Sequence, residues 1–257
     1  MSTTSQAIEI NVQNEEISGT FLAPGTQLPG VLFVHGWGSG QKGDMARALG
    51  VAALGCVCLT FDLRGHAATQ AQQGRVSRED NYRDVVAAYD MLAAHPSVDP
   101  AAIAIVGSSY GGYLAALLTT HRPVKWLALQ VPALYRDEHW TMPKGQLNRA
   151  DLTAYRQTHV LPQDNRALRA CSAFKGDVLI VESEHDTYVP HPAIMSYRAA
   201  FQQAHSLTHR IIDGADHALS TEASQEAYTW ILLNWATEMV SGARLGGLGY
   251  GAPVAAA

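Results

Sequence analysis

A serine flanked by glycines is the first candidate for chemistry in this chain. Ser109 lies in GSSYGG, residues 107–112, after an apolar run at 102–107 and before a helix-like run at 113–120. The pattern G-x-S-x-G between a strand and a helix predicts a strained turn that exposes a nucleophilic hydroxyl. Glycine suits the two flanking positions because larger side chains would collide with the adjoining strand and helix. We therefore predict that Ser109 is a nucleophile.

Other interpretations of this turn are an ordinary glycine-rich connection and a phosphate-binding loop. The segment lacks the G-K-[ST] ending and the G-x-G-x-x-G spacing of nucleotide-binding loops. Ser108 is the rival serine, but only Ser109 has glycine both two residues before and two residues after it. These differences favour the nucleophile interpretation.

A serine hydroxyl is a weak nucleophile until a positioned imidazole takes its proton. With this kind of turn the expected chain order is serine, acid, histidine. Of the eight histidines after Ser109, only His217 lies in a loop just past the last strand-like run, in GADHAL at 214–219. His209 lies within that run and His205 at a helix end, so both are interpreted as structural or surface residues. We predict that His217 is the general base.

The acid that orients this base should follow the preceding strand-like run. The segment ESEHDTYVP at 182–190 offers three carboxylates. Asp186 lies farthest past the strand end, and its short side chain suits a fixed bond to imidazole. Glu184 is the alternative, while Asp213 and Asp216 are too near His217 in sequence and suit turns. We predict Asp186 as the acid.

A second glycine-rich loop, HGWGSG at 35–40, follows the strand-like run 31–34. A loop at this place in such a fold supplies a backbone N–H to the oxyanion, beside the N–H of the residue after the nucleophile. The predicted donors are therefore the N–H groups of Trp37 and Tyr110, with the Trp37 indole as a wall of the acyl pocket. The alternative is a plain turn, and His35 is interpreted as structural.

The elements that must position these residues alternate along the chain. An amphipathic helix is predicted over 78–94, capped by Ser77, because its apolar residues recur at helical spacing. Continuous apolar strands separated by helices predict a mostly parallel sheet buried on both faces. Segments 7–12 and 16–22 are interpreted as an antiparallel hairpin at its edge. The other strand-like runs are 31–35, 55–61, 102–107, 124–131, 177–183 and 207–213.

Two segments depart from this alternation. Residues 132–173 contain no strand-like run and are predicted to form a small helical cap, whose Trp140 and Met142 we expect to line the substrate pocket. Residues 242–257 are rich in glycine and alanine without periodicity and are predicted to be a tail. The rest, residues 1–241, is predicted to be a single domain.

Composition limits the function further. The chain has 257 residues, 16% of them charged, and a formal net charge of −5, which argues against a nucleic-acid-binding protein. Three cysteines do not make a disulfide framework. No secretory signal or membrane-spanning apolar run is visible, so we expect a cytoplasmic protein without membrane partners.

Five motifs together resemble the α/β-hydrolase superfamily. They are HGWGSG at 35–40, FDLRGHA at 61–67, GSSYGGYLA at 107–115, EHDTYVP at 184–190 and GADHAL at 214–219. GSSYGGYLA is most similar to the catalytic domains of prolyl oligopeptidase and acylaminoacyl-peptidase relatives, while the chain length is similar to dienelactone hydrolases and cinnamoyl or feruloyl esterases. The resemblance implies an eight-stranded, mostly parallel α/β-hydrolase sheet flanked by helices. It also implies a triad of Ser109, Asp186 and His217.

The chain departs from these relatives in three places. Ala67 replaces the last glycine of the D-x-R-G-x-G turn, which we interpret as a structural turn held by Asp62 and Arg64. Only about thirty residues precede the strand-like run 31–35, too few for the extra domain of the propeller-bearing peptidases. Ser109 stands where strict dienelactone hydrolases have cysteine.

These features predict a carboxylesterase that acts on soluble short-chain or aromatic esters through an acyl-enzyme. The expected partner is a small-molecule ester, and no metal or organic cofactor is needed. Alternatives are a small peptidase or amidase, another acyl-transfer enzyme on the same triad, and a non-catalytic ligand binder. The sequence leaves the oligomeric state open, a homodimer included.

Overall fold

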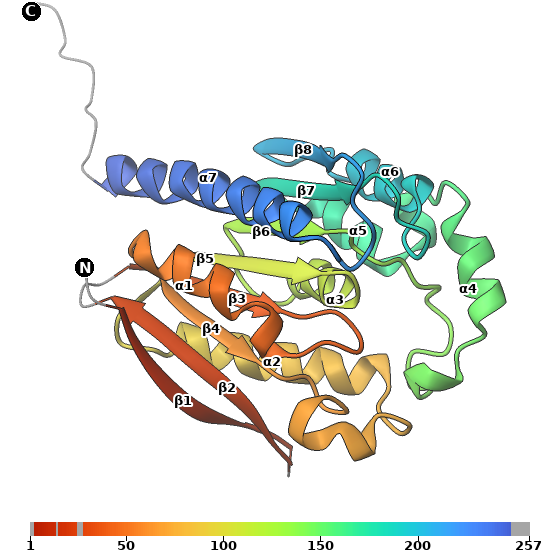
Figure 1. Cartoon of the computed structure of the whole chain (residues 1–257), viewed down its shortest axis with the longest axis horizontal. Helices are drawn as coiled ribbons and strands as arrows, with labels where there is room; N and C mark the ends of the chain where they lie inside the picture. Colours follow the sequence, from red (N-terminus) through yellow and green to blue (C-terminus); the bar gives the residue numbers. More distant parts are fainter. Residues whose placement is uncertain (1–2, 14, 25–27, 248–257) are drawn as a thin grey trace, which may run out of the picture.

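The computed structural model describes residues 3–13, 15–24 and 28–247. Its centre is an eight-stranded sheet of order β1-β2-β4-β3-β5-β6-β7-β8 (Figure 1). From β4 to β8 every pairing is parallel, while β1 and β2 form an antiparallel hairpin that joins the sheet through β4. The predicted edge hairpin and mostly parallel sheet are confirmed. The strands are β1 (Thr3–Val12), β2 (Glu15–Pro24), β3 (Leu28–Val34), β4 (Val57–Phe61), β5 (Val98–Ser108), β6 (Trp126–Gln130), β7 (Asp177–Ser183) and β8 (Ser206–Ile212).

Helices cover both faces of the sheet, because its central strands are apolar on both sides. Side chains alternate along β5: Ile103 and Ile105 face one helical layer, and Ala104 and Val106 face the other. The first layer contains α2 (Arg78–Ala93), α3 (Tyr110–Leu118), α5 (Arg166–Ala173) and α6 (His191–Ala200), and the second contains α1 (Met45–Ala53) and α7 (Glu222–Gly247). Two short 3-10 turns, η1 (Gln41–Gly43) and η2 (Ala67–Gln72), follow β3 and β4.

Helix α2 begins where the sequence predicts it. The backbone N–H of Asp80 donates to the Ser77 hydroxyl (3.1 Å), and the Ser77 N–H donates to the Asp80 carboxylate (2.9 Å), which makes a capping box. Val85, Tyr89 and Leu92 on its apolar face are buried in the core. The prediction of a capped helix over 78–94 is confirmed to within one residue at its end.

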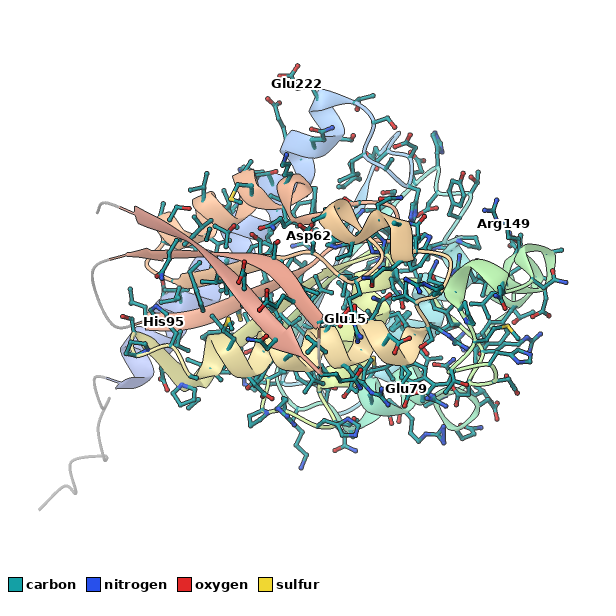
Figure 2. The ribbon with its side chains drawn as sticks, turned by 90° about the horizontal axis from the view of Figure 1, so that it is seen from below. Glu15, Asp62, Glu79, His95, Arg149 and Glu222 are labelled. Atoms are coloured by element: carbon teal, nitrogen blue, oxygen red, sulfur yellow. The ribbon has the colours of Figure 1, made fainter. Side chains whose placement is uncertain are left out.

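The insertion between β6 and β7 consists of short helices: η3 (Lys144–Gln146), α4 (Arg149–Arg156), η4 (Pro162–Asp164) and α5. Helix α4 stands off the edge of the sheet (Figure 1). In the view of Figure 2, Arg149 at its start lies on the outer side of the molecule, at the opposite end from His95. Helix α5 instead packs against α3 and α6. The part that projects beyond the sheet is therefore shorter than the predicted cap over 132–173.

The C-terminal helix is longer than expected. Helix α7 runs to Gly247, so residues 242–247 of the predicted tail continue it, and 248–257 lie outside the described residues. The division into a domain over 1–241 and a tail stays a prediction. None of the helices in the described part of the chain has the length and apolarity to cross a membrane.

Candidate active site

The turn between β5 and α3 holds Ser109 in a strained conformation. Ser109 has φ 51° and ψ −112°, a region that side-chain-bearing residues rarely adopt. Glycine is required on both sides. A Cβ on Gly107 would lie 2.7 Å from the carbonyl oxygen of Gly111, and one on Gly111 would lie 2.0 Å from that of Val34. The backbone of the turn thus packs directly on the end of β3, and this contact leaves the Ser109 hydroxyl on the open side.

Substituting Gly111→Ala should destabilise the whole protein, because the new methyl group meets backbone rather than a movable side chain. We expect the free energy of unfolding to fall by about 1–3 kcal/mol or more. Chemical denaturation followed by circular dichroism measures this. Gly74→Ala is the matched control, since a Cβ there meets no atom within 4 Å. Equal stability of both variants would contradict the close approach.

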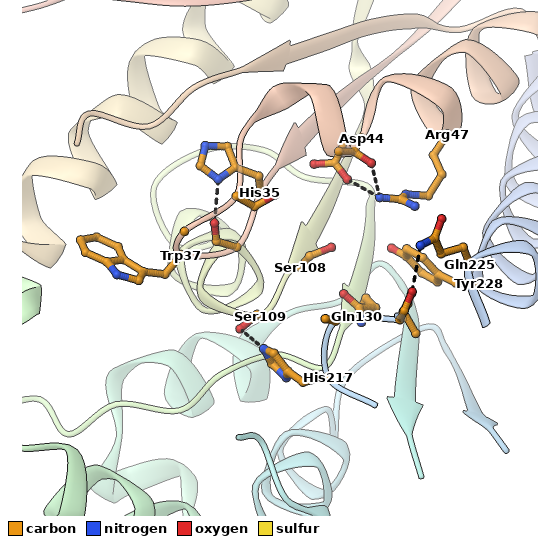
Figure 3. A pocket seen from close by; sticks show the side chains of 16 residues that line it. His35, Trp37, Asp44, Arg47, Ser108, Ser109, Gln130, His217, Gln225 and Tyr228 are labelled. Carbon is orange, nitrogen blue, oxygen red and sulfur yellow. Dashed lines mark hydrogen bonds and ion pairs between the residues drawn. The ribbon is translucent and has the colours of Figure 1, made fainter. Parts of the chain in front are cut away.

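Three side chains far apart in sequence meet at the carboxyl edge of the sheet. The Ser109 Oγ and the His217 Nε2 are 3.0 Å apart, and the His217 Nδ1 and the Asp186 Oδ2 are 2.6 Å apart (Figure 3 shows the first pair). The Asp186 side chain is 1% exposed and the His217 side chain 23%. A buried carboxylate therefore holds one ring nitrogen while the other faces the hydroxyl. The structure brings together all three residues that the sequence singles out.

The backbone fixes Asp186 in this position. Its Oδ1 accepts hydrogen bonds from the N–H groups of Tyr188 and Val189, both at 2.8 Å, which leaves Oδ2 for His217. Glu184, the alternative acid, is half exposed and accepts from the N–H of Gly214 instead (2.7 Å). Of these two acids, Asp186 is the one that contacts the imidazole.

Two neighbouring histidines, His209 and His191, have a different carboxylate as their partner. The His209 Nε2 and the His191 Nδ1 contact the two oxygens of Glu182, at 3.0 and 2.6 Å. Glu182 is buried at the end of β7. Hydrogen bonds from the two histidines outweigh burial and hold the pKa of Glu182 below its usual value. This cluster ties β7, β8 and α6 together beside the loop that carries Asp186.

The loop after β3 lies against the nucleophile. A Cβ on Gly36 would lie 3.4 Å from the Ser109 Cβ, so the loop backbone passes close to the reacting hydroxyl. Trp37 follows in this loop and lines the hollow over Ser109. Tyr110 is the first residue of α3, so its N–H has no acceptor within the helix. The two residues predicted to donate to the oxyanion thus belong to segments that adjoin the serine, and their role as donors stays a prediction.

His35 anchors the loop that carries Trp37. The Leu63 N–H donates to the His35 Nε2 (3.0 Å), and the Nδ1–H donates to the carbonyl of Gly36 (2.8 Å). One nitrogen accepts and the other donates, so the ring is neutral. Burial lowers the pKa of His35, which agrees with this state. The interpretation of His35 as structural fits these contacts.

Asp62 and Arg64 each anchor a different segment rather than one shared turn. The Asp62 carboxylate accepts from the backbone N–H of Gln41 (2.7 Å) and from its side-chain amide (2.9 Å), which fixes the far end of the oxyanion loop. The Arg64 Nε instead donates to Asp84 of α2 (2.6 Å), an ion pair buried on both sides. The segment is structural, as expected, but it connects the oxyanion loop and α2 to β4.

The ring of Trp37 contacts Tyr110 and two residues that the sequence analysis did not single out, Lys144 and His66. The Nζ of Lys144 lies 3.9 Å from its ring centroid, and the rings of His66 and Tyr110 pack edge-on against it at 4.8 and 5.5 Å. Burial lowers the pKa of Lys144, and it lowers the pKa of His66 to about 4. Lys144 comes from the insertion, where no sequence motif marks it, and thus joins the insertion to the oxyanion loop.

A hollow of about 450 Å³ opens over Ser109. Trp140 and Met142, which we expected to line the substrate pocket, do not line it. Trp140 lies in another hollow, beside Tyr82 and Arg166, and Met142 lies in a third. The insertion therefore places these two side chains at hollows other than the one over Ser109. Within the described residues, no group of three or more histidine, cysteine, aspartate or glutamate side chains could hold a metal ion.

Comparisons with known proteins agree with this geometry. Residues 42–243 match the prolyl oligopeptidase family. An uncharacterized protein of Mycobacterium tuberculosis is 27% identical over 191 residues, 74% of this chain and 63% of the relative, which is less than two thirds of its length. The mitochondrial palmitoyl-protein thioesterase ABHD10 of Homo sapiens is 31% identical over 103 residues, 39% of this chain and 32% of that protein.

Solved structures show the same fold. Dienelactone hydrolase from Anabaena variabilis superposes with a TM-score of 0.68 at 19% identity, covering 92% of this chain and 98% of that one. Est1E from Butyrivibrio proteoclasticus with bound ferulic acid gives 0.71 at 16% identity, covering 91% and 100%. An acylaminoacyl peptidase from Pyrococcus horikoshii gives 0.69 at 15% identity, covering 93% of this chain and 42% of the peptidase.

Proposed function

The chain belongs to the prolyl oligopeptidase family and is a serine hydrolase with the α/β-hydrolase fold, and from this premise we propose that it hydrolyses carboxylic esters of short-chain or aromatic acids. The catalytic residues in this proposal are Ser109, His217 and Asp186. The observation that carries it is the 3.0 Å contact between the Ser109 Oγ and the His217 Nε2. The proposed partner is a small-molecule ester. The proposed location is the cytoplasm.

The proposed reaction begins at Ser109. Its Oγ attacks the ester carbonyl while the Nε2 of His217 accepts the hydroxyl proton. Asp186 stabilises the imidazolium that forms, because its buried carboxylate is 2.6 Å from the Nδ1. The proton then passes from the Nε2 to the leaving alkoxide, and an alcohol departs. A water deprotonated by the same imidazole attacks the acyl-enzyme. The bond from the acyl carbon to the Ser109 Oγ then breaks, the Nε2 returns the proton to the Oγ, and the acid departs.

Negative charge on the carbonyl oxygen needs hydrogen-bond donors during both halves of this reaction. We assign the backbone N–H groups of Tyr110 and Trp37 to this role. The N–H of Tyr110 lies at the start of α3, where the helix dipole also favours negative charge. The loop of Trp37 is fixed by His35 and Asp62, so its N–H is preorganised.

Amide hydrolysis on the same residues is the second candidate, and the family match favours it. The likeness to dienelactone hydrolase and to Est1E with bound ferulic acid supports the ester. Amide hydrolysis also requires that the leaving nitrogen be protonated before the bond to the acyl carbon breaks.

A fluorophosphonate probe combined with mass spectrometry tests the nucleophile, and a substrate panel tests the reaction. We expect the label on Ser109, and faster turnover of p-nitrophenyl acetate than of p-nitrophenyl octanoate or an aminoacyl anilide. Faster turnover of the anilide would replace the ester proposal with the peptidase. Absence of label would favour a ligand-binding protein, and label on another residue would identify a different nucleophile. Either result would remove the catalytic assignment of Ser109.

A further inference from the structure

The hollow over Ser109 extends beyond the nucleophile toward α1 and α7. Figure 3 shows this wall on the far side of Ser109 from Trp37. The side chains of this wall are polar, although α1 and α7 pack on the sheet through an apolar core. We call it the polar wall and define it by the side chains of Asp44, Arg47, Gln130, Gln225 and Tyr228.

Gln130 is the member of the polar wall nearest to the chemistry. It ends β6, and its backbone carbonyl accepts the N–H of Ser109 at 2.8 Å. The residue is 5% exposed, and its side chain lines the hollow. Its amide offers two donors and an acceptor. A hydroxyl group bound in the hollow could pair with either end of this amide.

Tyr228 of α7 brings a buried hydroxyl to the same hollow. It is 2% exposed, and its hydroxyl lies near that of Ser108 but makes no hydrogen bond of good geometry. Burial raises the pKa of Tyr228 to about 12, so the hydroxyl keeps its proton. The Arg47 guanidinium lies 5.1 Å from the ring centroid and holds the ring in place.

The charges of the polar wall cancel. Asp44 and Arg47 form an ion pair at 3.0 Å, and the glutamines and tyrosine are neutral. An anionic ligand group would meet the Asp44 carboxylate, and a cationic group the Arg47 guanidinium. An alkyl chain would displace water from the Asp44 carboxylate and the Arg47 guanidinium. It could not replace the hydrogen bonds that this water makes, which is unfavourable. Hydroxyl groups, which donate and accept at the same atom, suit this mixture of donors and acceptors.

We propose that the polar wall binds a neutral, hydroxyl-rich part of the substrate, such as the sugar or glycerol portion of an acyl ester. This inference rests on the proposed ester hydrolysis and specifies its substrate. In it, Gln130 and Tyr228 determine specificity without contacting the reacting carbonyl. The acyl group then lies on the Trp37 side of Ser109.

Two measurements test the proposal, and the first does not depend on ester turnover. The rate of Ser109 labelling by a fluorophosphonate is followed with methyl glucoside, glycerol or cyclohexylmethanol as competitor. We expect the two polyols to slow labelling and the alcohol of similar size not to. Whichever of glycerol and methyl glucoside slows labelling more shows whether the polar wall prefers a glycerol or a sugar portion. Equal protection by all three compounds, or none, would overturn the inference even if the protein proves to be an esterase.

The second measurement is the ratio of kcat/KM for glycerol monoacetate to that for propyl acetate. Gln130→Met and Tyr228→Phe each remove hydrogen-bonding atoms with little change of shape, and we expect either to lower the ratio about 3- to 10-fold. Gln203→Met, at an exposed glutamine, should leave the ratio at the wild-type value. A ratio unchanged in both wall variants would overturn the inference. A failed ester proposal would instead show anilide turnover exceeding that of every acetate, while polyol protection of labelling persisted.

Discussion

Ser109→Ala is expected to lower kcat for p-nitrophenyl acetate by about 10⁴- to 10⁶-fold, the range for loss of a nucleophile from a serine–histidine–acid triad. The reason is that no acyl-enzyme can form without the Oγ that lies 3.0 Å from the His217 Nε2. Steady-state kinetics on purified protein measure the loss, and the fluorophosphonate label should disappear with it. The Oγ makes no other hydrogen bond among the described residues, so folding should be unaffected.

The matched control for this variant is Ser241→Ala, which removes the same atom from an exposed position on α7. It should keep wild-type kinetics. Thermal unfolding of both variants checks that neither loses stability. If Ser109→Ala retained more than about one per cent of wild-type kcat while folded, another residue would be the nucleophile.

Asp186→Asn is expected to lower kcat by about 10⁴-fold with little change in KM. The asparagine Oδ1 can still accept the N–H groups of Tyr188 and Val189, so the loop keeps its shape. Its amide group, however, now faces the His217 Nδ1 as a donor. The imidazole then carries its proton on Nε2 and cannot accept the one from Ser109. The measurement is kcat and KM for p-nitrophenyl acetate.

Glu184→Gln distinguishes between the two carboxylates that the sequence offered. Glutamine at 184 can still accept the N–H of Gly214, as Glu184 does at 2.7 Å. We expect its kcat to stay within a few-fold of wild type. A greater loss in Glu184→Gln than in Asp186→Asn would transfer the orienting role to Glu184 and contradict the geometry.

Much of the fold could be predicted because short-range patterns encode it. The apolar run before Ser109 and the helical spacing over 78–94 depend on neighbours within a turn or two of chain. The need for glycine at 107 is also local, since a Cβ there collides with the backbone of the same turn. At 111 the Cβ would instead meet Val34 of β3, which is distant in sequence, so the spacing of the motif marked a contact that the fold makes. Chain order then selected His217 among the histidines.

The positions of side chains in the insertion depend on how segments distant in sequence pack together. The sequence left some of these positions open, and for others our prediction was wrong. Trp140 and Met142 were expected at the pocket, but the direction of a side chain in an irregular insertion follows from its packing. The contact of Lys144 with Trp37 has the same origin, since it joins residues 107 positions apart.

By itself, the amino-acid sequence determined the strand–turn–helix that exposes Ser109 and the order in which acid and base follow it. Periodicity and glycine placement are properties of adjacent residues, and they act before the chain is compact. Only the tertiary structure decided that Asp186 rather than Glu184 reaches the imidazole, and that α1 and α7 bring a polar wall beside the serine. Such choices depend on distances between segments, which packing of the whole core sets to within a fraction of an ångström.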